Sequence, residues 1–200
     1  MTPALRPMAR SLPLALPLML LAAAAQAHTG AGHAGGFVSG FSHPILGWDH
    51  VVAMVAVGLW GAVLGKPAIW ILPVVFPLVM AFGAALGILG VPLPAVETGI
   101  ALSGVVLGLA VALAVRAPLP IAAVVVGVFA IFHGHAHGTE LPAAANPLAY
   151  GVGFVLGTGL LHMAGIALGL LTAKPAGRIV VRLAGGLIAV VGGAFLAGIA

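Results

Sequence analysis

Long apolar runs make up nearly the whole of this 200-residue chain and leave few folds open to it. Hydrophobic residues make up 62% of the sequence, charged residues only 5%, and the mean hydropathy is +1.29. A soluble domain of this size cannot hide that much apolar surface from water, so the composition predicts a polytopic membrane protein. The absence of cysteine excludes disulfides, thiolate metal ligands and thiol nucleophiles.

Six apolar runs follow residue 27, each close to the roughly 20 residues that cross about 30 Å of hydrocarbon as a helix. Short segments rich in proline and glycine separate them, which is typical of turns. The sequence therefore predicts an all-α bundle of six transmembrane helices, forming a single domain over residues 28–200. The expected spans are 44–64, 68–90, 97–115, 119–137, 147–172 and 179–199. Glycines four residues apart, such as Gly83 and Gly87, favour close helix packing in lipid.

Residues 1–27 have the pattern of a signal peptide. Arg6 and Arg10 form a basic start, a short apolar stretch follows, and residues 25–27 (Ala-Gln-Ala) match a small-x-small cleavage site. The alternative is an uncleaved first transmembrane helix, which the short, proline-interrupted apolar stretch disfavours.

Basic residues support the six-span topology. With residue 28 outside, the connections that carry Lys66, Arg116 and the group Lys174, Arg178 and Arg182 all fall inside. This distribution obeys the positive-inside rule and predicts a multi-pass protein of the bacterial inner membrane with a periplasmic mature N-terminus. The charges are dispersed, so nucleic-acid binding has no support.

The first span carries His43, Asp49 and His50, which are costly in hydrocarbon unless paired, solvated or ligand-bound. Pro44 suits the first helical position, which places His43 near the start of the span. His43 and His50 are seven residues apart, so in one continuous helix they share a face. Asp49 can hold a ring tautomer or bind a metal directly. The alternative is a His–Asp hydrogen bond that only locks helix packing.

The fourth span ends in a second polar segment, residues 132–140. Its apolar part is too short to cross the membrane alone, so the histidines must complete the span while facing protein or a wet cavity. His133 and His137 share a helix face and Glu140 follows, whereas His135 points elsewhere. The topology brings both polar segments to the outer side of the membrane.

Two further sites are weaker candidates. His162 lies in the middle of the fifth span, one turn from Thr158. It could bind the ion at a second site deeper in the membrane, or it could be a buried neutral histidine bonded to a backbone carbonyl. His28 and His33 would follow signal cleavage and could chelate a metal together with the new α-amine. A flexible glycine-rich tether is the equally weighted alternative.

Imidazoles and carboxylates without any thiol are the ligand set of a borderline divalent transition metal. No nucleotide-binding motif of the Gly-x-x-x-x-Gly-Lys-Ser/Thr type occurs, so transport would be driven by a gradient or by the membrane potential. No catalytic residue and no bound cofactor are predicted; the metal would be the substrate.

The polar segments resemble the HupE/UreJ family of bacterial membrane proteins over essentially the whole chain. The resemblance rests on His43-Pro44-x-x-Gly47-x-Asp49-His50, on residues 132–140 and on residues 153–165 around His162. It implies a secondary permease for Ni²⁺, or Co²⁺, that supplies hydrogenase or urease maturation. It also implies a metal role for a set of residues: His43, Asp49, His50, His133, His137, Glu140 and His162.

Two other functions stay open at this point. One is a metal-binding accessory protein that does not transport; the other is an intramembrane hydrolase that uses Ser103 and His162. The sequence does not choose among Ni²⁺, Co²⁺ and Zn²⁺, since all three accept imidazole and carboxylate ligands. It does not determine the oligomeric state either.

Overall fold

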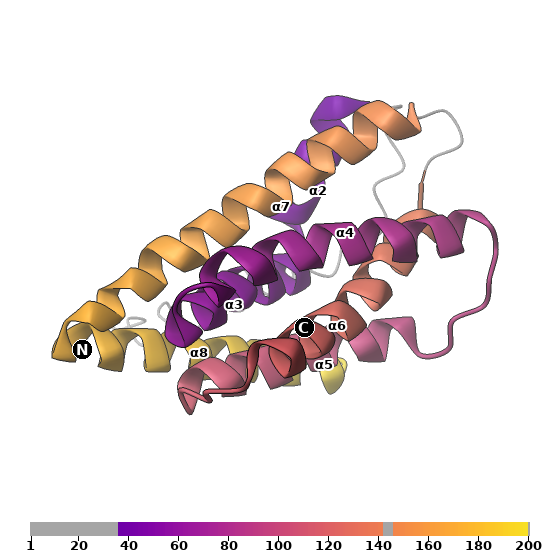
Figure 1. Ribbon diagram of the computed structural model, residues 1–200. Coiled ribbons are helices and arrows are strands. Elements are labelled where there is room, and N and C mark those ends of the chain that lie inside the picture. The colour runs from indigo at the N-terminus through magenta and orange to yellow at the C-terminus, as the bar shows by residue number, and fades with distance from the viewer. Residues whose placement is uncertain (1–35, 142–145, 200) are drawn as a thin grey trace, which may run out of the picture.

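The computed structural model describes residues 36–141 and 146–199, and within these ranges every regular element is a helix (Figure 1). The prediction of an all-α polytopic membrane protein is confirmed. The expected signal peptide, and with it His28 and His33, lies outside the described residues.

The first expected span is two helices, not one. Helix α2 (Phe37–Leu46) and helix α3 (Trp48–Leu64) meet at Gly47 with a bend of 80°. Gly47 has an extended backbone (φ −84°, ψ 111°), and Pro44 lies inside α2. The expectation that His43 begins a helix continuous with His50 is therefore wrong. Proline removes a backbone donor and glycine tolerates the break, so the chain turns there.

The remaining helices follow the expected order. They are α4 (Ala68–Ile88), α5 (Val96–Ala112), α6 (Leu119–Thr139), α7 (Pro147–Gly169), the 3₁₀ turn η2 (Leu170–Ala173) and α8 (Pro175–Leu196). Among the described residues, α4, α6, α7 with η2, and α8 are long and apolar enough to cross a membrane, and the bent α2–α3 pair adds a fifth candidate. The 17-residue α5 is apolar but shorter, so the structure supports four or five of the six predicted spans by length.

Glycines set which helices pack in close pairs. A Cβ at Gly83 or Gly138 would overlap the backbone across the α4–α6 contact, and one at Gly108 would do so between α5 and α8. Gly153 meets the backbone of α2, and Gly165 that of α3. In lipid, such close approach provides the van der Waals contact that holds helices together.

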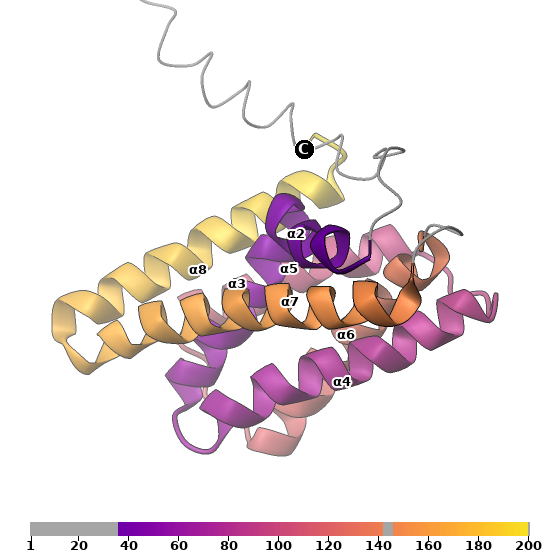
Figure 2. The same ribbon diagram turned by 90° about the horizontal axis from the view of Figure 1, so that it is seen from above.

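Helix α3 lies inside the bundle, and the outer helices face lipid. Met54, Val57 and Leu59 of α3 are fully buried, whereas the outer face of α4 exposes large side chains such as Leu78 and Phe82. Viewed from above, α7 runs between α8 and α4, with α2 over its first half (Figure 2). This arrangement brings α2, the start of α3, the end of α6 and the start of α7 to one end of the bundle.

Candidate metal site

Three histidines from three helices converge at this end. One ring nitrogen each from His43 (α2), His50 (α3) and His137 (α6) lie within 4.8 Å of one another. The ring centroids of His43 and His137 are 4.9 Å apart, and those of His43 and His50 are 5.7 Å apart. The break at Gly47 makes this possible, because it turns α2 so that His43 approaches His50 from a separate helix. We call these three residues the histidine triad.

Asp49 determines how His50 presents its ring. The Asp49 carboxylate oxygen lies 2.7 Å from Nδ1 of His50, and this close negative charge favours a proton on Nδ1. The neutral ring then keeps the lone pair on Nε2, which points to the other two histidines. Asp49 and His50 are both buried, so the negative charge lies in a medium that screens it poorly. It therefore favours a cation held by the triad.

Nε2 of His50 lies 2.6 Å from Nε2 of His137. Since Asp49 favours the proton of His50 on Nδ1, the proton between the two rings comes from His137, and Nε2 of His50 accepts it. A metal ion could replace this proton and bind both nitrogens. The arrangement can thus hold either a proton or a cation between α3 and α6.

His133 lies one turn deeper on α6 and is fully buried. Ser103 of α5 donates its hydroxyl proton to the Ile100 carbonyl at 2.6 Å, and its oxygen lies 3.0 Å from Nε2 of His133. The serine has only one proton, so His133 must donate from Nε2 and carry its lone pair on Nδ1. That Nδ1 has no hydrogen-bond partner among the described residues, and the ring centroid is 5.1 Å from that of His50. His133 is therefore a fourth imidazole with an available lone pair.

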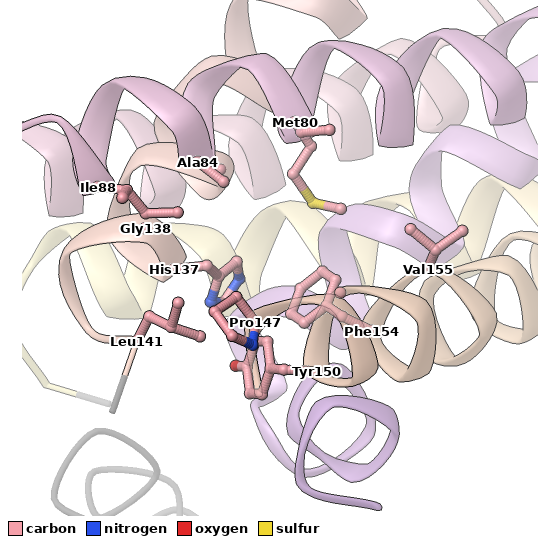
Figure 3. Close-up of a pocket in the computed structure, with 13 residues that line it drawn as sticks. Met80, Ala84, Ile88, His137, Gly138, Leu141, Pro147, Tyr150, Phe154 and Val155 are labelled. Atoms are coloured by element: carbon pink, nitrogen blue, oxygen red, sulfur yellow. The ribbon is translucent and has the colours of Figure 1, made fainter. Parts of the chain in front are cut away.

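Aromatic side chains surround the triad on the α7 side. The Phe154 ring centroid lies 4.3 Å from that of His137, and the Tyr150 ring is 6.3 Å from His43. A cavity of about 110 Å³ lies beside them, with the His137 ring facing Leu141, Pro147 and Phe154 (Figure 3). Such a shell excludes bulk water from the imidazoles and strengthens their interaction with a charged ligand.

His162 lies apart from the triad, in the middle of α7 and 1% exposed. Phe76 of α4 packs against both His133 and His162, at centroid distances of 5.6 Å and 5.5 Å. The Pro73 carbonyl lies within reach of the His162 ring. No hydrogen bond of ordinary geometry reaches either ring nitrogen, or the buried Thr158 hydroxyl one turn away, from the described residues.

The predicted site residues therefore fall into separate groups. His43, His50 and His137 come together, Asp49 supports His50, and His133 lies next to them. Glu140 ends α6, is exposed, and lies close enough to Tyr150 to interact electrostatically, so it belongs to the rim. His135 donates to the Val91 carbonyl at 2.7 Å, away from the triad as expected.

The sequence did not reveal three neighbours of the histidines: Ser103 as the partner of His133, Phe76 and Phe154. Ser103 was considered only as a nucleophile paired with His162. The structure pairs it with His133 instead, and its proton is already donated to Ile100. A serine within a glycine-rich apolar helix was the available signal. Phe76 resembles an ordinary lipid-facing residue in sequence, and Phe154 belongs to the motif at residues 153–165 but had no role assigned to it.

Comparison with known proteins places these residues in a wider context. The family model described as "HupE / UreJ protein" matches residues 16–195. A curated relative, "Protein HupE" from Rhizobium leguminosarum bv. viciae, is 50% identical over 183 residues, covering 92% of this chain and 95% of the relative. No solved structure matches.

Proposed function

Because this chain belongs to the HupE/UreJ family, we propose that it is a secondary permease that takes up Ni²⁺, with Co²⁺ as the competing ion. Its cargo would supply the maturation of a hydrogenase or urease. The main observation that supports this proposal is the histidine triad, together with Asp49, which favours one tautomer of His50. Three imidazoles and a nearby carboxylate suit a borderline divalent cation, and no thiol is present to bind it more tightly.

The histidine triad would receive the ion at the outer end of the bundle. Neutral imidazoles and the Asp49 charge would replace part of the hydration shell. The aromatic shell and the narrow cavity beside His137 would limit access to small ions. Glu140 on the rim would attract cations toward the cavity. A transport site must also release its ion, so an incomplete ligand set is expected.

His133, Phe76 and His162 would form the route inward. His133 has an unbonded nitrogen next to the triad, and the Phe76 ring must move before an ion can pass from His133 to His162. Phe76 lies on α4 between two prolines. Pro77 has no N–H, so it cannot donate to the Pro73 carbonyl as a regular helix would.

We assign the inner station to His162, the Thr158 hydroxyl and the Pro73 carbonyl. The side chains of His162 and Thr158 are buried and lack ordinary hydrogen bonds to the described residues. The Pro73 carbonyl faces the buried His162 ring. Unsatisfied buried polar groups are costly, so a passing cation would gain ligands here without breaking existing bonds.

The membrane potential is a sufficient driving force. A divalent cation moving inward gains about 4.6 kcal/mol per 100 mV, twice the value for a single charge. The orientation of the protein in the membrane follows from its basic residues, which we place on the cytoplasmic side. The mature N-terminus is then periplasmic. Reporter fusions after Lys66, Arg116 and Lys174 should therefore read cytoplasmic.

Metal flux into proteoliposomes tests the proposal. Purified full-length protein should admit Ni²⁺ or Co²⁺ faster than Mg²⁺ and Ca²⁺, and an inside-negative potential should accelerate the flux. His50→Ala should abolish it, while Thr172→Val, which removes a part-buried hydroxyl in η2, should not. Metal binding without flux at any potential would favour the non-transporting accessory protein.

A further inference from the structure

A second polar cavity lies at the end of the bundle opposite the histidines. It has a volume of about 280 Å³, and three arginines line it: Arg116 before α6, and Arg178 and Arg182 on α8. Arg116 precedes α6, whereas His137 lies near the end of that 21-residue helix, about 30 Å away along the axis. The cavity is therefore separate from the metal site.

Among the described residues that line the cavity, none carries a negative charge to balance the three arginines. Its other lining residues are Val63, Ala114, Thr172 and Val181, none of them acidic. The chain has three acidic residues in all, and Asp49, Glu97 and Glu140 belong to other parts of the sequence. The N-terminus of α8 adds partial positive charge next to Arg178. Three guanidinium groups around one cavity repel one another, so an anion bound there would relieve the repulsion.

Backbone hydrogen bonds orient two of these side chains. Nε of Arg178 donates to the Thr172 carbonyl at 3.1 Å, and Nε of Arg182 donates to the Ala112 carbonyl at 2.7 Å. Each bond uses one of the five N–H groups of a guanidinium and leaves the terminal nitrogens for a ligand. Planar guanidinium groups bind phosphate through paired N–H groups, so phosphate is the anion that this cavity suits best.

An apolar groove continues from the arginine cavity. It has a volume of about 320 Å³ and is lined by Ala112, Ile179, Leu183 and Arg182, the last of which it shares with the cavity. Ile179 and Leu183 are 62% and 69% exposed. A free phosphate would fill only the cavity, whereas a phospholipid has a phosphate for the arginines and an acyl chain for the groove.

We propose that Arg116, Arg178 and Arg182 bind the phosphate of an anionic phospholipid whose acyl chain lies along Ile179 and Leu183. Basic pockets between transmembrane helices at the membrane surface are suited to such headgroups. The bound lipid would add a link between the α5–α6 connection and the start of α8, next to the Arg182 to Ala112 hydrogen bond. This proposal does not depend on the identity of the transported metal.

Thermal unfolding of the purified full-length protein in neutral detergent tests the lipid site. Phosphatidylglycerol should raise the unfolding midpoint more than phosphatidylcholine with the same acyl chains, and inorganic phosphate should have little effect. Native mass spectrometry should retain phosphatidylglycerol as a bound species. Equal stabilisation by the two lipids would overturn the proposal, and equal stabilisation by inorganic phosphate would show a soluble anion as the ligand.

Two variants locate the site. Arg182→Gln and Arg116→Gln should each remove most of the difference between phosphatidylglycerol and phosphatidylcholine. The matched control Lys66→Gln removes an exposed positive charge from a different connection and should keep that difference. If Lys66→Gln reduces it as much as the arginine variants do, diffuse charge explains the preference and the site is refuted. The comparison in the unmodified protein decides the matter even if an arginine variant fails to fold.

Discussion

The Nε2 atoms of His50 and His137 lie 2.6 Å apart, although 87 residues separate them in sequence. A metal with imidazole bonds of about 2.0–2.1 Å, as for zinc, would hold two neighbouring nitrogens about 3 Å apart. A small outward movement of α6 relative to α3 would therefore exchange the shared proton for a metal ion. Protons and metal compete for one position in the triad.

The first prediction follows from this competition. Imidazoles bind metal only when neutral, so nickel should displace any proton that makes the triad cationic, and proton release should increase as the pH falls. Affinity should therefore weaken as pH falls from about 7.5 to 5.5, by up to about tenfold per pH unit for one competing proton. A pH-indicator dye during nickel titration measures the release. Binding with no proton release and no pH dependence would contradict the assignment.

The second prediction concerns Asp49. Asp49→Asn removes the negative charge and allows the wrong ring tautomer of His50, so nickel affinity should fall about 10- to 100-fold. His50→Ala should lose at least as much. Because Asp49 acts through His50, the double variant should be no worse than His50→Ala alone. Equilibrium dialysis with the purified proteins measures all three. Additive losses would show that Asp49 binds the metal independently of His50.

The third prediction separates the histidines of α6. His137→Ala should abolish most nickel uptake at normal protein abundance, since it removes a member of the triad. His135→Ala should have a milder effect on uptake, because that ring bonds to the Val91 carbonyl outside the triad. Uptake of ⁶³Ni²⁺ by cells, normalised to the amount of protein in the membrane, measures both. If uptake falls only in proportion to abundance, the histidines serve packing alone.

The fourth prediction concerns Ser103. Ser103→Ala leaves the buried Nε2–H of His133 without an acceptor, which should cost about 1–3 kcal/mol of stability. It should also weaken nickel transport, because the lone pair of His133 is no longer fixed on Nδ1. Thermal unfolding in detergent and proteoliposome flux measure the two effects. An unchanged unfolding midpoint would show that the hydrogen bond contributes nothing.

The fifth prediction tests the inner station. Thr158→Val keeps the shape of the side chain but removes a buried hydroxyl that lacks a partner among the described residues, so the protein should be as stable or more stable. Uptake should nevertheless fall severalfold, and Thr158→Ser should restore it. Unchanged uptake with raised stability would mean that the hydroxyl has no part in transport.

Much of this protein follows from its sequence because lipid permits few solutions. Apolar runs of membrane length require helices, so the all-α class and the approximate limits of α4, α6, α7 and α8 could be predicted. The histidines of α6 had to complete a span that was otherwise too short. Polar residues in so apolar a chain are costly, and this alone identified every histidine of the triad.

Tertiary structure decided which of those residues meet and in what chemical form. The break at Gly47 replaced the expected shared face of His43 and His50 with an approach of two helices, which local pattern does not specify. The packing of α5 against α6, where Gly99 meets the Phe132 ring, sets the depth of His133 relative to Ser103. Tautomers depend on hydrogen bonds between distant segments. The sequence thus determined the ligand chemistry, and helix packing decided the geometry, because spacing within one helix does not determine its partner.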